Sequence, residues 1–199
     1  MIGANPRIAT FDGNDFAFNG LGDYWFVQVL NYGLQIRMAP CSNSDPSTGT
    51  CIRAVAFRGI SNNLITFMVD PETGLLTIYS SISGIVKRNV YGIDHFPVID
   101  NYALDVQAIS TPFSESPAYR VSITDQTSES IRSFGFVLGD KMGANVFAVL
   151  NIFEMGETVG LCGTFDGCAE NDFYSANQNY VSVGDSDANV YNGFADTCM

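Results

Sequence analysis

Basic residues are scarce in this chain. Its 199 residues include 9 Lys and Arg against 21 Asp and Glu, so the formal net charge is −12. A nucleic-acid-binding protein needs a basic surface to neutralise phosphates, and anionic membranes attract the same kind of surface. We therefore expect neither nucleic acid nor a membrane surface as a partner. This acidity suggests divalent cations or secretion instead.

Long hydrophobic runs are also missing. The longest apolar stretches are short, as in Val146 to Leu150, whereas a spanning helix needs about 20 apolar residues. The first residues, Met1 to Arg7, lack the apolar core of a signal peptide. We expect no membrane span in this segment, and either a cytosolic protein or a domain of a longer secreted chain.

Catalytic motifs are absent as well. The chain has one histidine, His95, which follows Asp94, and it contains no G-x-S-x-G, P-loop or dinucleotide-binding motif. A catalytic triad needs a base, an orienting carboxylate and a nucleophile within reach of one another. Carboxylates are plentiful, but no spacing singles out a pair, and one tryptophan, Trp25, gives little support for a sugar-binding cleft. We therefore predict that the chain is not an enzyme.

The chain has five cysteines, at Cys41, Cys51, Cys162, Cys168 and Cys198. The first two bracket a polar loop rich in turn residues, and a disulfide between them would staple a hairpin, as is usual in oxidising compartments. The other three cannot all pair with one another, and the sequence leaves their pairing open. The C-x5-C spacing is not a usual zinc pattern, and no histidine lies near it.

Apolar residues are abundant, at 46% of the chain against 15% charged residues, which excludes disorder as the main state. Short strand-like segments recur every ten residues or so, separated by turn residues, and no βα alternation is present. The expected strands are Tyr24–Leu30, Leu34–Met38, Ile52–Arg58, Leu64–Val69, Leu75–Tyr79, Val86–Tyr91, Tyr102–Ile109, Ala118–Thr124, Ile131–Leu138 and Asn145–Phe153. We predict an all-β chain, an antiparallel β-sandwich or barrel, in one domain over residues 1–199.

One segment near the end of the chain has the composition of a cation-binding loop. Between Gly160 and Phe173, oxygen-bearing side chains stand at Thr164, Asp166, Asn171 and Asp172, among glycines that let the chain curl. Hard cations such as Ca²⁺ take several oxygens from carboxylates, amides and carbonyls. The spacing differs from an EF-hand loop, and a polar surface loop with Asx turns would have a similar composition.

A second acidic segment near the start completes a family pattern. The motifs F-D-G-x4-F-x-G, at Phe11–Gly20, and G-L-C-G followed by D-G and N-D-F, at Gly160–Phe173, resemble the von Willebrand factor type D domain. The match spans the chain, with its motifs near the two ends. Phe18–Tyr24 looks like the branch found in transmembrane mucins and in sushi-domain surface proteins with an adhesion-associated AMOP module. Ile52–Phe57 and Gly156–Leu161 are similar to the same branch.

The resemblance implies an antiparallel β-sandwich in which a calcium ion ties the first turn to the loop near the C-terminus. On this basis residues 1–155 would form the sandwich core, and residues 156–199 the calcium loop and an irregular tail. Cys168 would offer only its backbone carbonyl, and Thr164 stands where the family usually has Asn. The implied metal ligands are Asp12, Thr164, Asp166, Cys168, Asn171 and Asp172.

Two positions depart from the family pattern. Many members have a cysteine just after F-x-G that pairs with the one in G-L-C-G, but Gly22 stands there in this chain, so Cys162 lacks that partner. Some relatives begin with Gly-Asp-Pro-His and cleave themselves at Asp-Pro. The corresponding run is Ala4 to Arg7, without Asp or His, so we expect no such cleavage.

Three functions follow from these patterns. The first is a non-catalytic, calcium-stabilised structural and adhesion module of a larger secreted or cell-surface protein, acting outside the cell on extracellular proteins or on neighbouring domains. The second is a β-sandwich that binds a lipid or glycan, suggested by 15 Phe and 9 Tyr. The third is a subunit of a disulfide-linked polymer, suggested by the odd number of cysteines. For the first, we expect Asp12→Ala and Asp172→Ala to lower the melting temperature only when calcium is present.

Overall fold

We describe the fold from a computed structural model of the chain. The described residues are 6–30, 32–41, 49–70, 73–82, 84–88, 93–110, 117–127, 133–139, 143–151 and 154–172. The chain divides into two compact units, one formed by residues 1–52 and 152–199 and the other by residues 53–151, and each is described by itself. Our expectation of a single domain over residues 1–199 stays a prediction.

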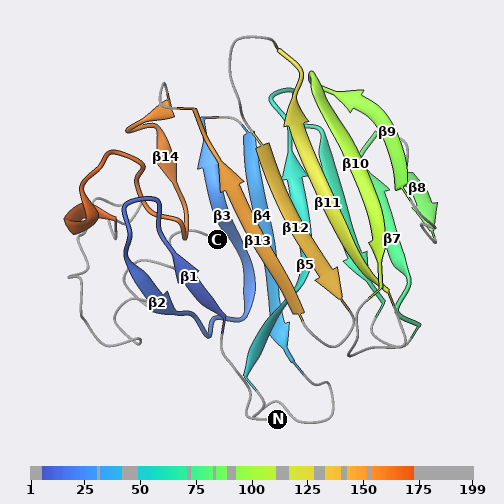
Figure 1. Cartoon of the computed structure of the whole chain (residues 1–199), viewed down its shortest axis with the longest axis horizontal. Helices are drawn as coiled ribbons and strands as arrows, with labels where there is room; N and C mark the ends of the chain where they lie inside the picture. The colour runs from blue at the N-terminus through green and yellow to red at the C-terminus, as the bar shows by residue number, and fades with distance from the viewer. Residues whose placement is uncertain are drawn as a thin grey trace. The chain divides into compact units, whose positions relative to one another are not determined.

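The first unit contains the beginning and the end of the chain. Strands β1 and β2 form an antiparallel hairpin, and β14 pairs with β3, which in turn pairs with β4. In Figure 1 the blue hairpin and the orange-red segment that follows β14 belong to this unit. Its elements are β1 (Arg7–Ala9), β2 (Asp15–Ala17), β3 (Gly22–Val29), β4 (Tyr32–Pro40), β14 (Thr158–Val159) and the 3-10 helix η3 (Ala169–Asn171).

The core of this unit is made by residues that β3 and β4 turn to one face. Tyr24 of β3 and Ile36 of β4 are opposite each other in the register, and both are buried. Phe18 packs edge-on against Tyr24, with ring centroids 5.0 Å apart. Leu161, from the far end of the chain, is buried too. Burial of each such side chain contributes about 1.5–3 kcal/mol, so the late segment is held by the same hydrophobic effect as the strands.

The predicted disulfide between Cys41 and Cys51 is confirmed. The two Cα atoms lie 4.9 Å apart, and the bond closes the loop between the end of β4 and the start of β5 (Thr50–Arg58), the strand that leads into the second unit. The backbone N–H of Cys41 also donates to the carbonyl of Gly49, at 3.0 Å.

Replacing both cysteines, as Cys41→Ser with Cys51→Ser, should lower the free energy of unfolding by about 2–3 kcal/mol, because the unfolded chain regains the conformational entropy of the closed loop. Urea unfolding of the wild type and the double variant measures this difference. Wild-type protein unfolded in a reducing agent provides the control, and it should match the double variant. Equal stability of all three samples would contradict the prediction.

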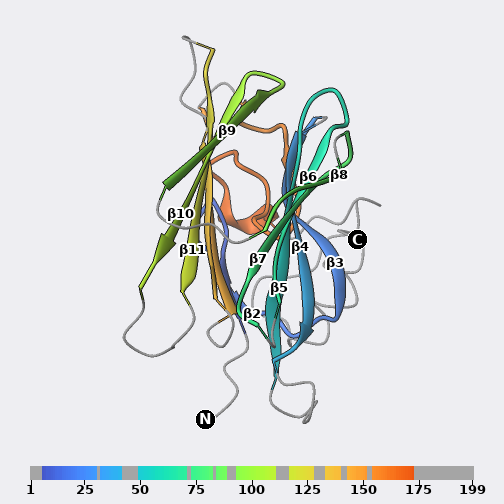
Figure 2. The same ribbon diagram turned by 90° about the vertical axis from the view of Figure 1, so that its right-hand side faces the viewer.

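The second unit contains two antiparallel sets of strands. In one set β5 pairs with β6, β6 with β7 and β7 with β8, and in the other the order is β13-β12-β11-β10-β9. Figure 2 shows β9, β10 and β11 in a different layer from β6, β7 and β8. The strands are β6 (Leu64–Val69), β7 (Leu76–Ser80), β8 (Gly84–Arg88), β9 (Ile93–Ile99), β10 (Tyr102–Ile109), β11 (Ala118–Asp125), β12 (Ser133–Gly139) and β13 (Gly143–Val149).

Aromatic rings join the two layers of the second unit. Phe57 of β5 lies 5.6 Å from Phe134 of β12, and Phe67 of β6 lies 5.1 Å from Phe136 of β12, measured between ring centroids. All four side chains are almost fully buried. Offset and edge-on ring pairs of this kind add stability beyond the area they bury. These rings pack against one another, which disfavours the interpretation of the phenylalanines as the lining of a lipid or glycan site.

The prediction of an all-β chain with antiparallel strands is confirmed. The described residues contain no α-helix, and their only helical segment among the named elements is the 3-10 turn η3. Nothing in this part of the chain forms a helix with the length and hydrophobicity that crossing a membrane requires.

Candidate metal centre

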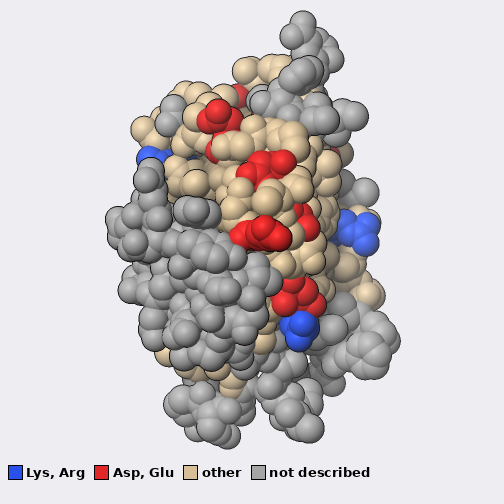
Figure 3. All heavy atoms as spheres, turned by 90° about the vertical axis from the view of Figure 1, so that its left-hand side faces the viewer, with Lys and Arg blue, Asp and Glu red and all other residues tan. Residues whose placement is uncertain are grey.

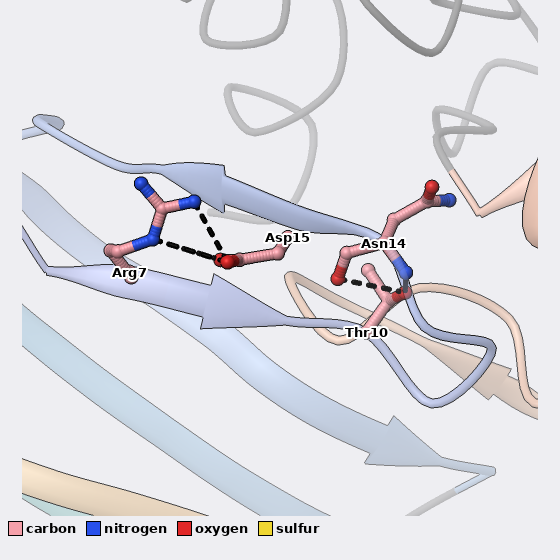
Figure 4. Close-up of polar contacts among 4 residues, drawn as sticks. All are labelled: Arg7, Thr10, Asn14 and Asp15. Atoms are coloured by element: carbon pink, nitrogen blue, oxygen red, sulfur yellow. Dashed lines mark hydrogen bonds and ion pairs between the residues drawn. The ribbon is translucent and has the colours of Figure 1, made fainter.

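The turn between β1 and β2 is built by local polar contacts. The backbone N–H of Thr10 donates to the carbonyl of Asn14 at 2.8 Å, and the N–H of Asn14 donates to the Thr10 hydroxyl at 2.9 Å (Figure 4). An ion pair between Arg7 and Asp15, with 2.7 Å between Nη2 and Oδ2, joins the two strands at the base of the turn. This frame presents Asp12 at the tip.

The loop that follows β14 is fixed to β3 through its backbone. The N–H groups of Leu161 and Cys162 donate to the carbonyls of Trp25 and Phe26, both at 2.9 Å. Inside the loop, the buried hydroxyl of Thr158 accepts the N–H of Phe165 at 2.6 Å. The loop is therefore anchored to the sheet on one side and crosslinked on the other before it reaches the acidic residues.

The two segments meet, although more than 150 residues separate them. One carboxylate oxygen of Asp12, Oδ2, accepts the backbone N–H groups of Asp166 (3.1 Å), Gly167 (3.1 Å) and Cys168 (3.2 Å). Figure 1 shows the blue hairpin beside the orange-red loop. The sequence expectation that the F-D-G turn and the late loop meet is therefore confirmed.

Backbone and ring contacts extend the same junction. The N–H of Phe11 donates to the carbonyl of Cys162 at 3.0 Å, and the rings of Phe11 and Phe165 lie 5.4 Å apart. Phe11 belongs to the F-D-G motif and Phe165 precedes Asp166, so the aromatic residue of each motif contacts that of the other. This pairing places the acidic residue that follows each phenylalanine close to the opposite segment.

Asp172 is the most deeply buried acidic residue of the junction, at 1% relative exposure. Its Oδ2 accepts the Thr10 hydroxyl at 2.5 Å and the Asn14 side-chain N–H at 2.9 Å. Its Oδ1 is buried and has no hydrogen-bond partner among the described residues. Burial raises the pKa of Asp172 above its usual value, and repulsion from Asp12 adds to the increase, whereas the bonds from Thr10 and Asn14 and the backbone N–H of Thr164 oppose it.

Asp166 and Asn171 form a pair beside Asp172. The Asn171 side-chain N–H donates to Oδ2 of Asp166 at 2.7 Å, and the Cys168 N–H donates to Oδ1 at 2.9 Å. The bond from Asn171 is the main cause of a lowered pKa at Asp166. The amide oxygen of Asn171 is buried and, within the described part of the chain, accepts no hydrogen bond.

The remaining two predicted ligands have weaker positions. The carbonyl of Cys168 accepts the N–H of Asn171 at 3.2 Å, so this carbonyl is already used by the 3-10 turn. The exposed thiol of Cys168 forms no disulfide with a described residue. Thr164 is partly exposed, and we see no contact of its hydroxyl with Asp12 or Asp166 in the described part of the chain. Cys198 lies outside the described residues, and the pairing of Cys162, Cys168 and Cys198 stays open.

The donors at this junction are of mixed chemistry. Among the described residues, no group of three or more His, Cys, Asp and Glu side chains is placed to hold a metal ion. A cation there would therefore depend on amide and carbonyl oxygens as well as carboxylates, a combination typical of calcium sites. The two buried oxygens without partners, on Asn171 and Asp172, fit that requirement.

Sequence reasoning missed Thr10 and Asn14, which hold Asp172 in place. The nitrogen of the Asn14 side chain contacts both Asp172 and the carbonyl of Ala169. The available signal was their position, because both residues flank F-D-G and are typical turn formers. Their residue types alone indicate a turn and do not connect them with the late loop.

The surface around the junction is acidic. Glu157 and Glu170 are exposed residues of the late segment, and Figure 3 shows acidic side chains gathered on one face of the molecule. A surface of one charge sign raises the local concentration of ions of the opposite sign. The field at this face therefore favours the approach of cations.

Comparison with known proteins gives two results. The model of the von Willebrand factor type D domain matches residues 71–179, which is more than half of the chain and includes the late loop. Mucin-19 of Mus musculus is 27% identical over 187 residues. That alignment covers 92% of this chain and 2% of Mucin-19, so the chain spans a small fraction of this relative.

Proposed function

Because the chain belongs to the von Willebrand factor type D family, we propose that it is a calcium-stabilised structural and adhesion module of a larger extracellular protein. The type D domain is a non-catalytic module of large extracellular proteins and can bind calcium, in agreement with the prediction that the chain is not an enzyme. The similarity to Mucin-19 suggests an extracellular protein as well.

One observation carries the proposal. Oδ1 of Asp172 and Oδ1 of Asn171 are buried acceptors without a hydrogen-bond partner among the described residues. Leaving a buried polar group unpaired costs about 1–3 kcal/mol, and more when the group is charged. A bound cation would satisfy both oxygens and offset the repulsion between Asp12 and Asp172, which raises the pKa of Asp172 together with its burial.

In this proposal the ion joins the F-D-G turn to the late loop of a β-sandwich. Asp172, Asn171 and Asp166 would supply side-chain oxygens from the loop, and Asp12 would supply one from the turn. Thr164 and the carbonyl of Cys168 are weaker candidates. When bound, calcium supplies positive charge at a junction that has an excess of carboxylates, and it stabilises the folded state because it binds that state alone.

The extracellular location has support from the disulfide. Cys41 and Cys51 are bonded, and disulfides persist mainly in oxidising compartments. We keep two finer assignments as part of the proposal. The first is the branch of transmembrane mucins and sushi-domain surface proteins, supported by residues Phe18–Tyr24. The second is a role in contacts with neighbouring domains or other extracellular proteins.

Isothermal titration of the chelator-treated chain with Ca²⁺ tests the proposal. We expect one ion per chain, and much weaker binding of Mg²⁺, because Mg²⁺ demands near-octahedral geometry and loses its water reluctantly. Asp105→Asn, on β10 in the other unit, is a matched control and should bind as the wild type does. Absence of Ca²⁺ binding, or a loss of binding in the Asp105→Asn variant equal to that in Asp172→Asn, would overturn the proposal.

A further inference from the structure

We propose that Asp12 is a positioning residue that closes the late loop onto the F-D-G turn before calcium binds. The inference rests on the proposed function for the identity of the ion, but the contacts that carry it involve no metal. Its basis is the set of three backbone N–H groups, at residues 166, 167 and 168, that converge on one oxygen of Asp12 at 3.1–3.2 Å.

Consecutive backbone N–H groups that point to one spot form a concave site for an anion. The carboxylate of Asp12 occupies such a site. The F-D-G turn, near the start of the chain, therefore supplies the negative charge that organises the late loop. Hydrogen bonds with an ionised acceptor are stronger than neutral ones. Because Oδ2 is already engaged by these donors, Asp12 has one carboxylate oxygen, Oδ1, left for an ion.

Contacts around Asp12 support closure in the absence of metal. The backbone N–H of Phe11 donates to the carbonyl of Cys162, and the Phe11 ring packs on the ring of Phe165. Thr10, which precedes Phe11, and Asn14, on the other side of Asp12, both donate to one oxygen of Asp172. The turn therefore touches the loop through the residues on both sides of Asp12, and none of these contacts needs a cation.

Asp12 and Asp172 should consequently behave differently when calcium is removed. The carboxylate of Asp12 accepts hydrogen bonds from the loop, so removing this carboxylate should open the junction both with and without calcium. Asp172 has one buried oxygen without a partner, so the cost of burying its charge is offset in full only when an ion is bound. The sequence alone predicted that both substitutions act only with calcium, and the three N–H bonds change this expectation for Asp12.

Thermal melts in a chelator test the inference. Asp12→Ala should lower the melting temperature by about 4–8 °C without calcium, because the three N–H groups lose their charged acceptor. Asp12→Asn, whose amide oxygen can still accept these bonds, should recover at least half of that loss. Asp15→Ala, which removes an exposed ion pair of the same hairpin, should lower it by no more than about 2 °C.

Amide hydrogen exchange locates the effect. In the chelator, Asp12→Ala should accelerate exchange at the N–H groups of residues 166–168 at least tenfold and leave the N–H of Phe165, which bonds to Thr158, within twofold of the wild type. Unchanged melting and exchange of Asp12→Ala in the chelator would overturn the inference. A different result, the absence of Ca²⁺ binding by the wild type, would overturn the proposed function. The chelator experiments contain no calcium, so they would still test the role of Asp12.

Discussion

Saturating calcium should raise the melting temperature of the wild-type chain by about 5–10 °C, and Asp172→Asn should remove most of this increase. A ligand at 100 times its dissociation constant stabilises the folded state by about 2.7 kcal/mol, and 1 kcal/mol shifts the melting temperature of a chain of this size by about 2–4 °C. Asp172 carries the largest share because its buried Oδ1 has no other partner among the described residues.

The chelator condition separates ligand loss from simple damage. Burial raises the pKa of Asp172, so the protonated carboxyl group favours folding fully below its unfolded pKa. That contribution is lost as the pH rises through the raised folded pKa. At neutral pH without calcium, the charged form is therefore a cost, and Asp172→Asn should melt at the same temperature as the wild type or higher. This advantage should shrink in acid, below about pH 4, where the unfolded carboxyl is protonated too.

Differential scanning fluorimetry of the wild type, Asp172→Asn and Asp15→Asn, each with calcium and with chelator, checks these values. Asp15 is exposed and paired with Arg7, so Asp15→Asn should keep the calcium increase. If Asp172→Asn retained the full calcium-induced increase in melting temperature, binding of the ion would not depend on the buried carboxylate. If it melted far below the wild type in the chelator, Asp172 would be a structural residue and not a ligand.

The sequence predicted the long strands of the fold well. Segments such as Leu64–Val69 and Tyr102–Ile109 coincide with β6 and β10, because a strand with one buried face has an alternating pattern that can be read directly. Strands of two or three residues, such as β1, β2 and β14, are too short to show a period. Strand β9 was missed because Ile93–Ile99 contains an aspartate and a proline, which argue against a strand.

The sequence predicted which residues belong to the candidate site, but not the hydrogen bonds that hold them. Asp12, Asp166, Asn171 and Asp172 came from the paired motifs, and the structure brings their segments together. That Asp12 is held by backbone N–H groups could not be predicted, because every residue except proline has such a group and its direction depends on local dihedral angles. The unpartnered oxygen of Asp172 is likewise a property of packing, since it depends on which neighbours reach it.

Replacing Gly163 is the second change for which we expect a large fall in the melting temperature, because this position has no space for a side chain. Its φ of +74° lies in the left-handed region, and a Cβ there would overlap Oδ1 of Asp172 and lie 2.8 Å from its Cγ. Gly156, in the same segment, has a φ of +80° and nothing within 4 Å of an added Cβ. The two glycines therefore share the conformational penalty of an alanine, about 1–2 kcal/mol, but differ in the steric one.

Gly163→Ala should lower the melting temperature by about 5–15 °C, because an overpacking cost of about 1–3 kcal/mol adds to the penalty for positive φ. Gly156→Ala should lower it by about 2–8 °C and keep the increase that calcium causes. Gly163→Ala should lose that increase, because its methyl group displaces the Asp172 carboxylate. In the double variant Gly163→Ala with Asp172→Asn, the effects on the calcium increase should not add, because both act on one oxygen. Full calcium stabilisation of Gly163→Ala would mean that the ion is bound by groups other than Oδ1 of Asp172.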